Sequence, residues 1–206
     1  MAQPSKIFLL SPATSHGAKA RKLLEPGLKT PAAEQLRSAG GMPLGALFRH
    51  LSGLYFNSKL AYARAFARAP AALSGAGVYI ITMTDGLLTP DTSVGAAELA
   101  RFAAAEHGSD EGRLALRRSA RALAEAAGAR CQAIFLGSLA SGKYTDALLP
   151  AFGPRLLFPR ALLGLGQLDR GALLFRCVRE GRELEYAPVA EIAGKRPGRR
   201  DDGMTG

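Results

Sequence analysis

Short, continuously apolar runs alternate along the chain with longer segments in which apolar residues recur at helical spacing. A run that is apolar on both faces is typical of a strand buried in a sheet that helices cover on both sides. The clearest is Val-Tyr-Ile-Ile-Thr at residues 78–82, which is rich in β-branched and aromatic side chains. The pattern predicts strands at residues 6–11, 78–82, 132–136 and 155–158, and a short one at 183–189.

Apolar residues three and four positions apart predict the helices. The strongest such stripe covers residues 56–69. Residues 110–127 begin with acidic side chains and are followed by glycine, which is typical of a helix stabilised at both ends. Further helices are expected at residues 16–24, 32–38, 44–51, 96–106, 145–149 and 169–179. Outside the two helices at 32–38 and 44–51, the stretch from 26 to 53 is expected to be irregular.

Strands that alternate with helices in this way predict an α/β fold, a three-layer sandwich with a mostly parallel central sheet. The length of 206 residues fits a single domain, which we place at residues 1–193. Residues 194–206 are basic and rich in Gly and Pro, so we expect them to form a disordered tail.

The net charge of +10 favours polyanionic partners such as DNA or RNA. The tail accounts for +2 of this charge, which leaves +8 on the domain itself. An equally open interpretation is that a GC-rich bacterial coding bias placed arginines on a solvated surface. The charge alone therefore does not decide between the two.

The cysteines and histidines point away from disulfide and metal chemistry. Cys131 and Cys177 are far apart and each lies in an apolar segment, which is typical of buried thiols in a reducing cytoplasm. The three histidines lack metal-ligand spacing, so we expect no metal and no cofactor. No apolar run approaches the roughly 18 residues of a membrane span. We therefore expect a cytoplasmic protein with no membrane partner.

The turns after three of the predicted strands share small hydroxyl residues, glycine and one ionisable group. In doubly wound sheets, ligands bind where such turns meet at the carboxyl ends of the strands. Hydroxyl groups and closely approaching backbone suit phosphate or sugar oxygens, although the same residue types also cap helices. The candidate ligand-binding residues are Ser11, Thr14, Ser15, Thr84, Gly137, Ser138, Ser141, Gly142 and Lys143.

Residues 137–145, Gly-Ser-Leu-Ala-Ser-Gly-Lys-Tyr-Thr, nearly match the phosphate-binding loop G-x-x-x-x-G-K-[ST]. Tyr144 stands where that motif has the hydroxyl that ligates Mg²⁺, and no later strand ends in a clear Walker B aspartate. The segment therefore predicts an anion-binding turn with Lys143 as its ligand rather than a degenerate NTPase. A solvated surface lysine is the competing interpretation.

Three ionisable residues are candidates for acid–base catalysis. Asp85 and Asp91 bracket the turn that follows the strand at 78–82, and His16 lies in the first strand-to-helix turn. Each could move a proton if the fold places it beside a ligand. A turn or cap role for Asp91 and a surface position for His16 are the alternatives.

Two sets of residues are candidates for contact with nucleic acid. Aromatic and basic residues share a stripe on the helix at 56–69, and arginines recur every four residues on the helix at 110–127. Partly buried tyrosines with a snorkelling lysine, and a solvated helix face, are the alternatives. The candidates are Tyr55, Lys59 and Tyr62 in the first set and Arg113, Arg117 and Arg121 in the second.

The helix that opens with Leu54-Tyr55 and the later turn Gly86-Leu-Leu-Thr-Pro-Asp91 resemble a bacterial and phage domain family of unknown function. The resemblance covers roughly residues 6–150 and implies an α/β domain similar to the uracil-DNA-glycosylase-like type, some members of which accompany base-modifying enzymes. The family's first turn tends to carry a Cys-Ser pair and a Lys. Here that turn has Ser11-Pro12, followed by Thr14, Ser15 and His16.

These patterns lead to one main expectation and one rival from another class. We expect a domain whose turns bind a nucleotide or nucleic-acid moiety, with hydrolytic or glycosylase-like chemistry at a base or sugar if it is an enzyme. The rival is a non-catalytic module that holds nucleic acid or a protein partner through its basic surface.

Overall fold

The computed structural model describes residues 4–105 and 109–194, and within them six strands form the main sheet in the order β4-β3-β1-β6-β7-β8. The first strand, β1, lies near the middle, with parallel β3 and β6 on either side. β7 extends the parallel part, while β4 and β8 add antiparallel edges. The strands are β1 (Lys6–Leu10), β2 (Met42–Pro43), β3 (Val78–Ile81), β4 (Leu87–Leu88), β5 (Ser93–Val94), β6 (Gln132–Leu136), β7 (Leu156–Pro159) and β8 (Tyr186–Pro188).

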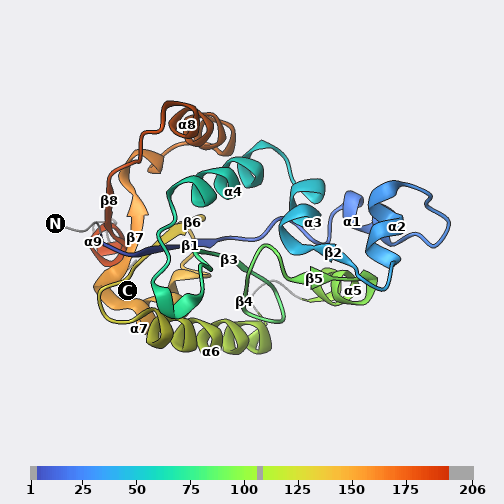
Figure 1. Cartoon of the computed structure of the whole chain (residues 1–206), viewed down its shortest axis with the longest axis horizontal. Coiled ribbons are helices and arrows are strands. Elements are labelled where there is room, and N and C mark those ends of the chain that lie inside the picture. The colour runs from blue at the N-terminus through green and yellow to red at the C-terminus, as the bar shows by residue number, and fades with distance from the viewer. Residues whose placement is uncertain (1–3, 106–108, 195–206) are drawn as a thin grey trace, which may run out of the picture.

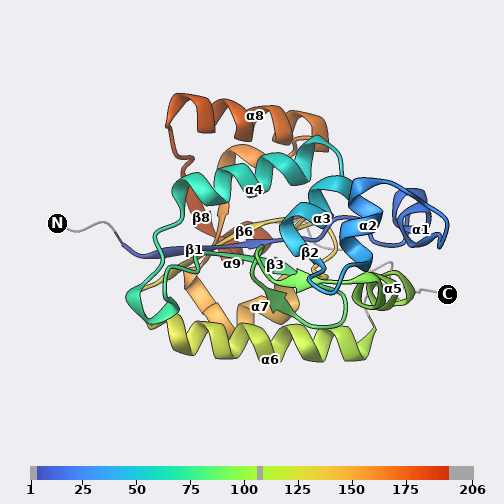
Figure 2. The ribbon, with the colours of Figure 1, turned by 45° about the vertical axis from the view of Figure 1, so that its right-hand side comes forward.

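Helices cover both faces of this sheet, as the views in Figures 1 and 2 show. α4 and α8 pack side by side on one face, and α6 and α7 pack together on the other. The α/β fold, the mostly parallel sheet and the single compact domain are confirmed. The α-helices are α1 (Ala18–Leu24), α2 (Pro31–Arg37), α3 (Leu44–Leu51), α4 (Leu54–Phe66), α5 (Ala96–Ala104), α6 (Asp110–Ala127), α7 (Thr145–Phe152), α8 (Gln167–Glu180) and α9 (Val189–Gly194).

The parallel register aligns the ends of the two central strands. Leu10 at the end of β1 pairs with Leu136 at the end of β6, and every residue of β1 is buried. Ser11 and Gly137 therefore leave the sheet side by side. β3 ends on the other side of β1, where a turn through Gly86 leads into β4.

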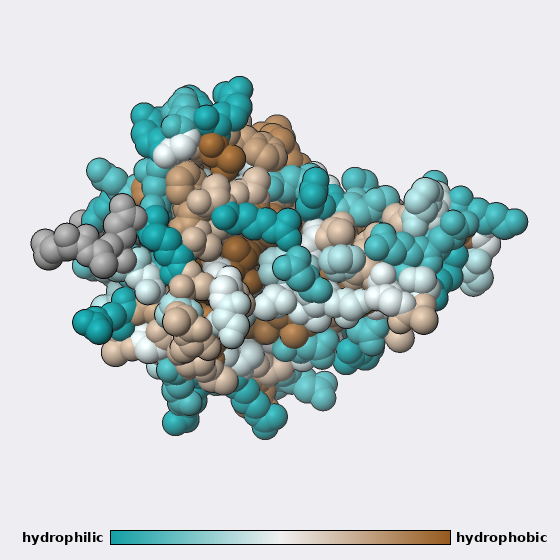
Figure 3. All heavy atoms as spheres, in the orientation of Figure 1, coloured by the Kyte–Doolittle hydropathy of each residue, from teal (hydrophilic) through white to brown (hydrophobic). Residues whose placement is uncertain are grey.

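A small lobe extends beyond the carboxyl ends of the central strands. It contains α1, α2, α3 and α5 with the paired strands β2 and β5, and it forms the right-hand part of Figure 1. On the side of the molecule seen in Figure 3, hydrophilic side chains gather on the lobe and around α8, and apolar side chains are visible between them.

A polar network lies at the opposite, amino end of β1. Lys6 is 4% exposed and forms an ion pair with Glu183, whose other oxygen accepts from Arg68 at 3.1 Å. The Tyr186 hydroxyl donates to Glu183 at 2.8 Å and lies 2.9 Å from the Tyr62 hydroxyl. This network connects the first strand to the segment between α8 and β8.

Most predicted elements occur within a few residues of the expected positions, and α6 and β6 have the predicted bounds. The two-residue strands β2, β4 and β5 were not predicted, because two residues are too few to show a periodicity. The predicted tail at 194–206 begins one residue too early, because Gly194 ends α9. The rest of the tail and the predicted end of a helix at residue 106 lie outside the described residues.

Candidate functional site

At the carboxyl ends of the neighbouring strands β1 and β6, the chain connections leave in opposite directions across the sheet. From β1 the chain passes to β3 on one side, and from β6 it passes to β7 on the other. In open α/β sheets, the crevice at such a topological switch point is the usual ligand site. The site of this chain is therefore sought beside Ser11 and Gly137.

A cleft of about 330 Å³ opens at this point. Four elements contribute to it: the turn after β1, helix α4, the turn after β6 and the beginning of α8. Its volume lies at the lower end of the range for small-molecule sites, about 300–1,000 Å³. The polar side chains that line it are Ser11, Thr14, Ser52, Tyr55, Lys59, Ser138, Gln167 and Arg170.

Lys59 lies at the inner end of this cleft. Helix α4 places its side chain among core residues, where it is 2% exposed. Its Nζ donates to both the carbonyl oxygen and the Oγ of Ser11, each at 2.7 Å, and lies over the Tyr55 ring. Burial, with a smaller contribution from the positive charge of Arg170, lowers the pKa of Lys59 to about 7.

Arg170 comes from the first turns of α8, which packs against α4. Its guanidinium donates to the carbonyl of Gly137 at a long 3.4 Å. Among the described residues, neither its Nε nor the Tyr55 hydroxyl has a hydrogen-bond partner of good geometry, although both atoms are buried. Burial raises the pKa of Tyr55, and the nearby Arg170 opposes that rise. The two groups lie near each other, and buried polar atoms without a well-aligned partner are rare in proteins, so they are candidates for contact with a ligand.

The cleft is electropositive. None of its lining residues, all within the described part of the chain, is Asp or Glu. The first turn of α8 borders it; the N-cap residue Gly166 has no side chain, and the same turn carries the carboxylate of Asp169, which lies outside the lining of the cleft. Helix N-termini favour anions, and here Lys59 and Arg170 add two side-chain donors. The arrangement can hold an anion with two or more acceptor oxygens.

The structure brings together only part of the predicted ligand-binding set. Ser11, Thr14 and Ser138 line the cleft, together with Tyr55 and Lys59 from the predicted nucleic-acid stripe. Ser15 is buried and donates to the carbonyl of Phe102, which is a structural contact. His16 is exposed at the start of the lobe and does not line the cleft.

The turn after β3 faces a different hollow. Thr84 and Asp85 line a depression of about 720 Å³ between α5 and α6. Asp85 accepts from both terminal nitrogens of Arg101, at 3.2 and 3.3 Å, and Thr84 Oγ1 is buried without a partner among the described residues. Asp91 is exposed and pairs with Arg64. Asp85, Asp91 and His16 therefore do not meet in one site.

The loop that resembles a phosphate-binding loop is not an open cradle. Gly142 adopts φ +67°, and the Asp146 carboxylate lies over it, where an added Cβ would meet an oxygen at 2.9 Å. A carboxylate at this position disfavours a phosphate. Ser141 is exposed, and Lys143 lies in a separate hollow of about 20 Å³ beside Thr82, where burial lowers its pKa.

Tyr144 turns inward instead of replacing a metal ligand. Its ring packs 6.2 Å from that of Phe135, and burial raises the pKa of its hydroxyl to about 12. Within the described residues, no three His, Cys, Asp or Glu side chains gather as a metal site would require. In the same part of the chain, no helix is both long and apolar enough to cross a bilayer.

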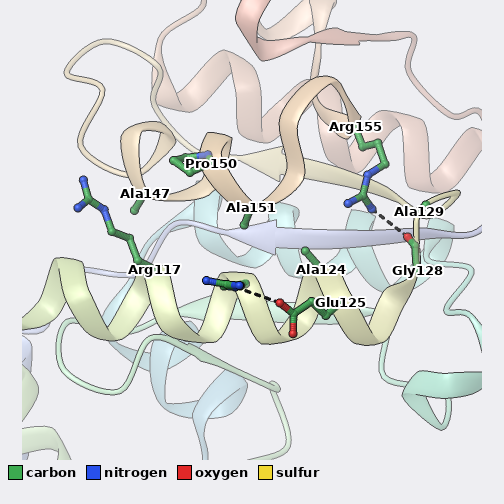
Figure 4. A pocket seen from close by; sticks show the side chains of 10 residues that line it. Arg117, Ala124, Glu125, Gly128, Ala129, Ala147, Pro150, Ala151 and Arg155 are labelled. Carbon is green, nitrogen blue, oxygen red and sulfur yellow. Dashed lines mark hydrogen bonds and ion pairs between the residues drawn. The ribbon is translucent and has the colours of Figure 1, made fainter.

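Two members of the predicted arginine ridge, Arg117 and Arg121, border a groove of about 810 Å³ between α6 and α7 (Figure 4). Arg117 extends beside Ala147 of α7, whereas Arg121 pairs with Glu125 at 3.0 Å. Arg113 pairs with Asp110 at the start of α6. This groove is distant from the strand ends at the switch point, and nucleic-acid contact along it stays a prediction.

Tyr62, the third member of the predicted aromatic stripe, is fully buried. It presents no ring face to a nucleic-acid base. Its hydroxyl instead accepts from the backbone N–H of Leu184 at 2.8 Å, as part of the network at the amino end of β1.

Sequence reasoning missed Arg170 and the first turn of α8. One signal could have identified them: a Gly-rich loop leads directly into a helix with a basic residue in its second turn. The same pattern was recognised at Lys143, where it resembled a known motif. The chain matches no family model, no curated protein and no solved structure with which it was compared.

Proposed function

We propose that this chain binds a phosphate-bearing ligand of nucleotide type in the cleft between β1, α4 and α8. The observation that carries the proposal is the pairing of Lys59 and Arg170 in a cleft whose lining has no carboxylate. Two cations held close together repel each other, and an anion between them would remove that repulsion. The proposal thus accounts for the otherwise unfavourable placement of both side chains.

The nucleotide, rather than a bare inorganic ion, is supported by the size and lining of the cleft. Its volume exceeds what one phosphate group needs, and Tyr55 and the hydroxyls of Thr14 and Ser138 border it. Aromatic and hydroxyl groups suit a base and a sugar, while Lys59 and Arg170 suit the phosphate.

Binding is best tested by calorimetric titration with inorganic phosphate, AMP and adenosine. We expect AMP to bind more tightly than phosphate, and adenosine to bind weakly or not at all. Arg170→Met should weaken AMP binding about 10- to 100-fold, because a hydrogen bond to a charged group contributes about 1.5–3 kcal/mol. Lys59→Met should weaken AMP binding less, because Lys59 lies behind Ser11 and acts on the anion through its charge. Lys22→Met, on the exposed face of α1, is the matched control and should bind like the unchanged protein.

The pH dependence of binding gives a second measurement. An anion favours the charged form of Lys59, so affinity should fall as pH rises above about 7. Equal affinity of the Lys59→Met, Arg170→Met and control proteins for AMP would contradict the proposal.

A further inference from the structure

We propose that Ser11 is a nucleophile and Lys59 its general base, and that the phosphate-bearing ligand of the cleft is a phosphate ester that this pair cleaves. The inference rests on the proposed function, which supplies the binding site. It adds a reaction and a substrate class to that site.

The geometry of a nucleophile and its base is already present. Lys59 Nζ donates to Ser11 Oγ at 2.7 Å, within the range of about 2.6–3.2 Å over which such groups exchange a proton, and the hydroxyl donates to the carbonyl of Leu136 at a long 3.4 Å, a bond that it gives up when Lys59 takes its proton. The second bond of Nζ, to the Ser11 carbonyl at 2.7 Å, fixes the amine relative to the serine. The Ser11 N–H donates to the carbonyl of Leu136, so the nucleophile is anchored to both central strands.

Ser11 is also accessible to a ligand. It is partly exposed and lines the cleft, whereas Lys59 lies behind it with only 2% of its surface exposed. A substrate can therefore reach the hydroxyl while water has little access to the amine.

The chemical state of Lys59 suits a base. A lysine takes a proton only when it is neutral, and an ordinary lysine is almost fully charged at neutral pH. Burial lowers the pKa of Lys59 to about 7, so a large fraction of the amine is neutral under physiological conditions. Catalytic lysines are adjusted by burial in the same way.

Arg170 and the first turn of α8 face the same space and supply donors for phosphoryl oxygens. A guanidinium can bind two of these oxygens at once, and the free N–H groups of a helix N-terminus add to it. Such fixed donors stabilise the charge that develops on a phosphoryl group during transfer. Among the described residues that line the cleft there is no carboxylate or histidine, so the acid–base role is assigned to the lysine.

The reaction balances without a metal or a further reactant. Lys59 Nζ takes the Ser11 hydroxyl proton as Oγ forms a bond to phosphorus and the bond from phosphorus to the alcohol oxygen breaks. Lys59 then gives its proton to the departing alkoxide. A water molecule next attacks the phosphoseryl group, its proton passes through Lys59 to Ser11 Oγ, and phosphate leaves. The sum is a phosphate ester and water converted into an alcohol and phosphate.

The test is covalent labelling with an alkyl fluorophosphonate, followed by mass spectrometry of the peptide that contains Ser11. The reagent is a phosphorus electrophile that loses fluoride to an activated serine. We expect Ser11 to be labelled, with a rate that rises as pH increases through about 7, and AMP to slow the labelling. Ser11→Ala should abolish labelling of this peptide, while Lys22→Met should leave the rate unchanged.

Two substitutions at Lys59 distinguish its role as a general base from its role as a positive charge. Lys59→Met conserves the length of the side chain and should lower the labelling rate at least about 100-fold, which is the usual contribution of a general base. Lys59→Arg keeps the positive charge but cannot lose it at neutral pH. It should therefore retain AMP binding and still lose labelling.

The outcomes distinguish this inference from the binding proposal. If AMP binds but Ser11 stays unlabelled, or if Lys59→Met is labelled as fast as the unchanged protein, the nucleophile is disproved and the binding site survives. If Ser11 is labelled without protection by AMP, the assignment of a phosphate ester is overturned. If the unchanged protein neither binds AMP nor is labelled at Ser11, both proposals are rejected.

Discussion

Lys59 shows how one buried charge makes stability depend on pH. Its pKa is 10.5 in the unfolded chain and about 7 in the folded one, so between these values only the unfolded state holds the proton. The free energy of unfolding therefore rises with pH across this window. Below pH 7 both states are protonated, and the full cost of burying the charge is present.

Replacing Lys59 with Met removes this titration. Relative to Lys59→Met, the unchanged protein should gain about 1.4 kcal/mol of stability per pH unit between pH 7 and 10. Urea denaturation at pH 6, 7, 8 and 9 measures the difference, and Lys22→Met provides the comparison with an exposed lysine. If the free energies of unfolding of the unchanged protein and of Lys59→Met differ by the same amount at every pH, a depressed pKa at Lys59 is contradicted.

At the scale of elements, the turn between β3 and β4 is fixed by its contact with α6. Gly86 adopts φ +71°, and an added Cβ would meet the side chain of Ser119 and, at 2.7 Å, the carbonyl of Ala115. Ser119 Oγ in turn accepts from the N–H of Leu87. The glycine thus lets the turn lie directly on the helix backbone.

Gly86→Ala should therefore combine backbone strain with a collision against α6. We expect it to lower the free energy of unfolding by about 2–4 kcal/mol, of which the left-handed backbone accounts for about 1–2 kcal/mol. Gly181→Ala, at φ +62° with no atom near the added Cβ, isolates the backbone contribution. Equal losses in the two variants, measured by chemical denaturation, would show that the contact with α6 is loose.

A helix or strand was predictable from sequence when its own residues show a periodic or continuous apolar pattern. The buried strands and α6 show such a pattern, because each residue of the apolar run or stripe is apolar where the fold buries it. The site does not, because Ser11, Lys59 and Arg170 come together only through the packing of α4 against α8 and of both against the sheet. Lys59 was selected for its neighbours along the helix, whereas its role in the cleft depends on Ser11, which is remote in sequence.

At the scale of the whole molecule, the pair Lys6–Glu183 spans 177 residues and connects the first strand to the last segment. Burial alone would raise the pKa of Glu183, but hydrogen bonds from Lys6, Tyr186 and Arg68 hold it below the usual value. A lowered carboxyl pKa stabilises the fold above the unfolded value near 4.5, and this contribution is lost as pH falls through the folded value.

Glu183→Gln should leave the buried amine of Lys6 without its ion-pair partner. Because Glu183 is partly exposed, we expect a loss of about 1–3 kcal/mol at pH 7, less than for a fully buried pair. The loss should shrink as pH falls from the unfolded value near 4.5 through the lowered folded value, because the unchanged carboxyl then becomes protonated as well. Thermal unfolding at pH 3 and pH 7 measures this, with Glu180→Gln on the exposed end of α8 as control; a loss independent of pH would refute the electrostatic account.

The central position of β1 has a consequence for synthesis on the ribosome. β1 is made before its partners, yet both of its edges are covered in the finished sheet, by β3 and β6. Until β6 has emerged, one edge of β1, which is apolar except for Lys6, is unpaired, and such edges recruit other chains. The nascent protein thus passes through a stage in which this edge is open to other chains, and the cleft at Ser11 forms only when that stage ends.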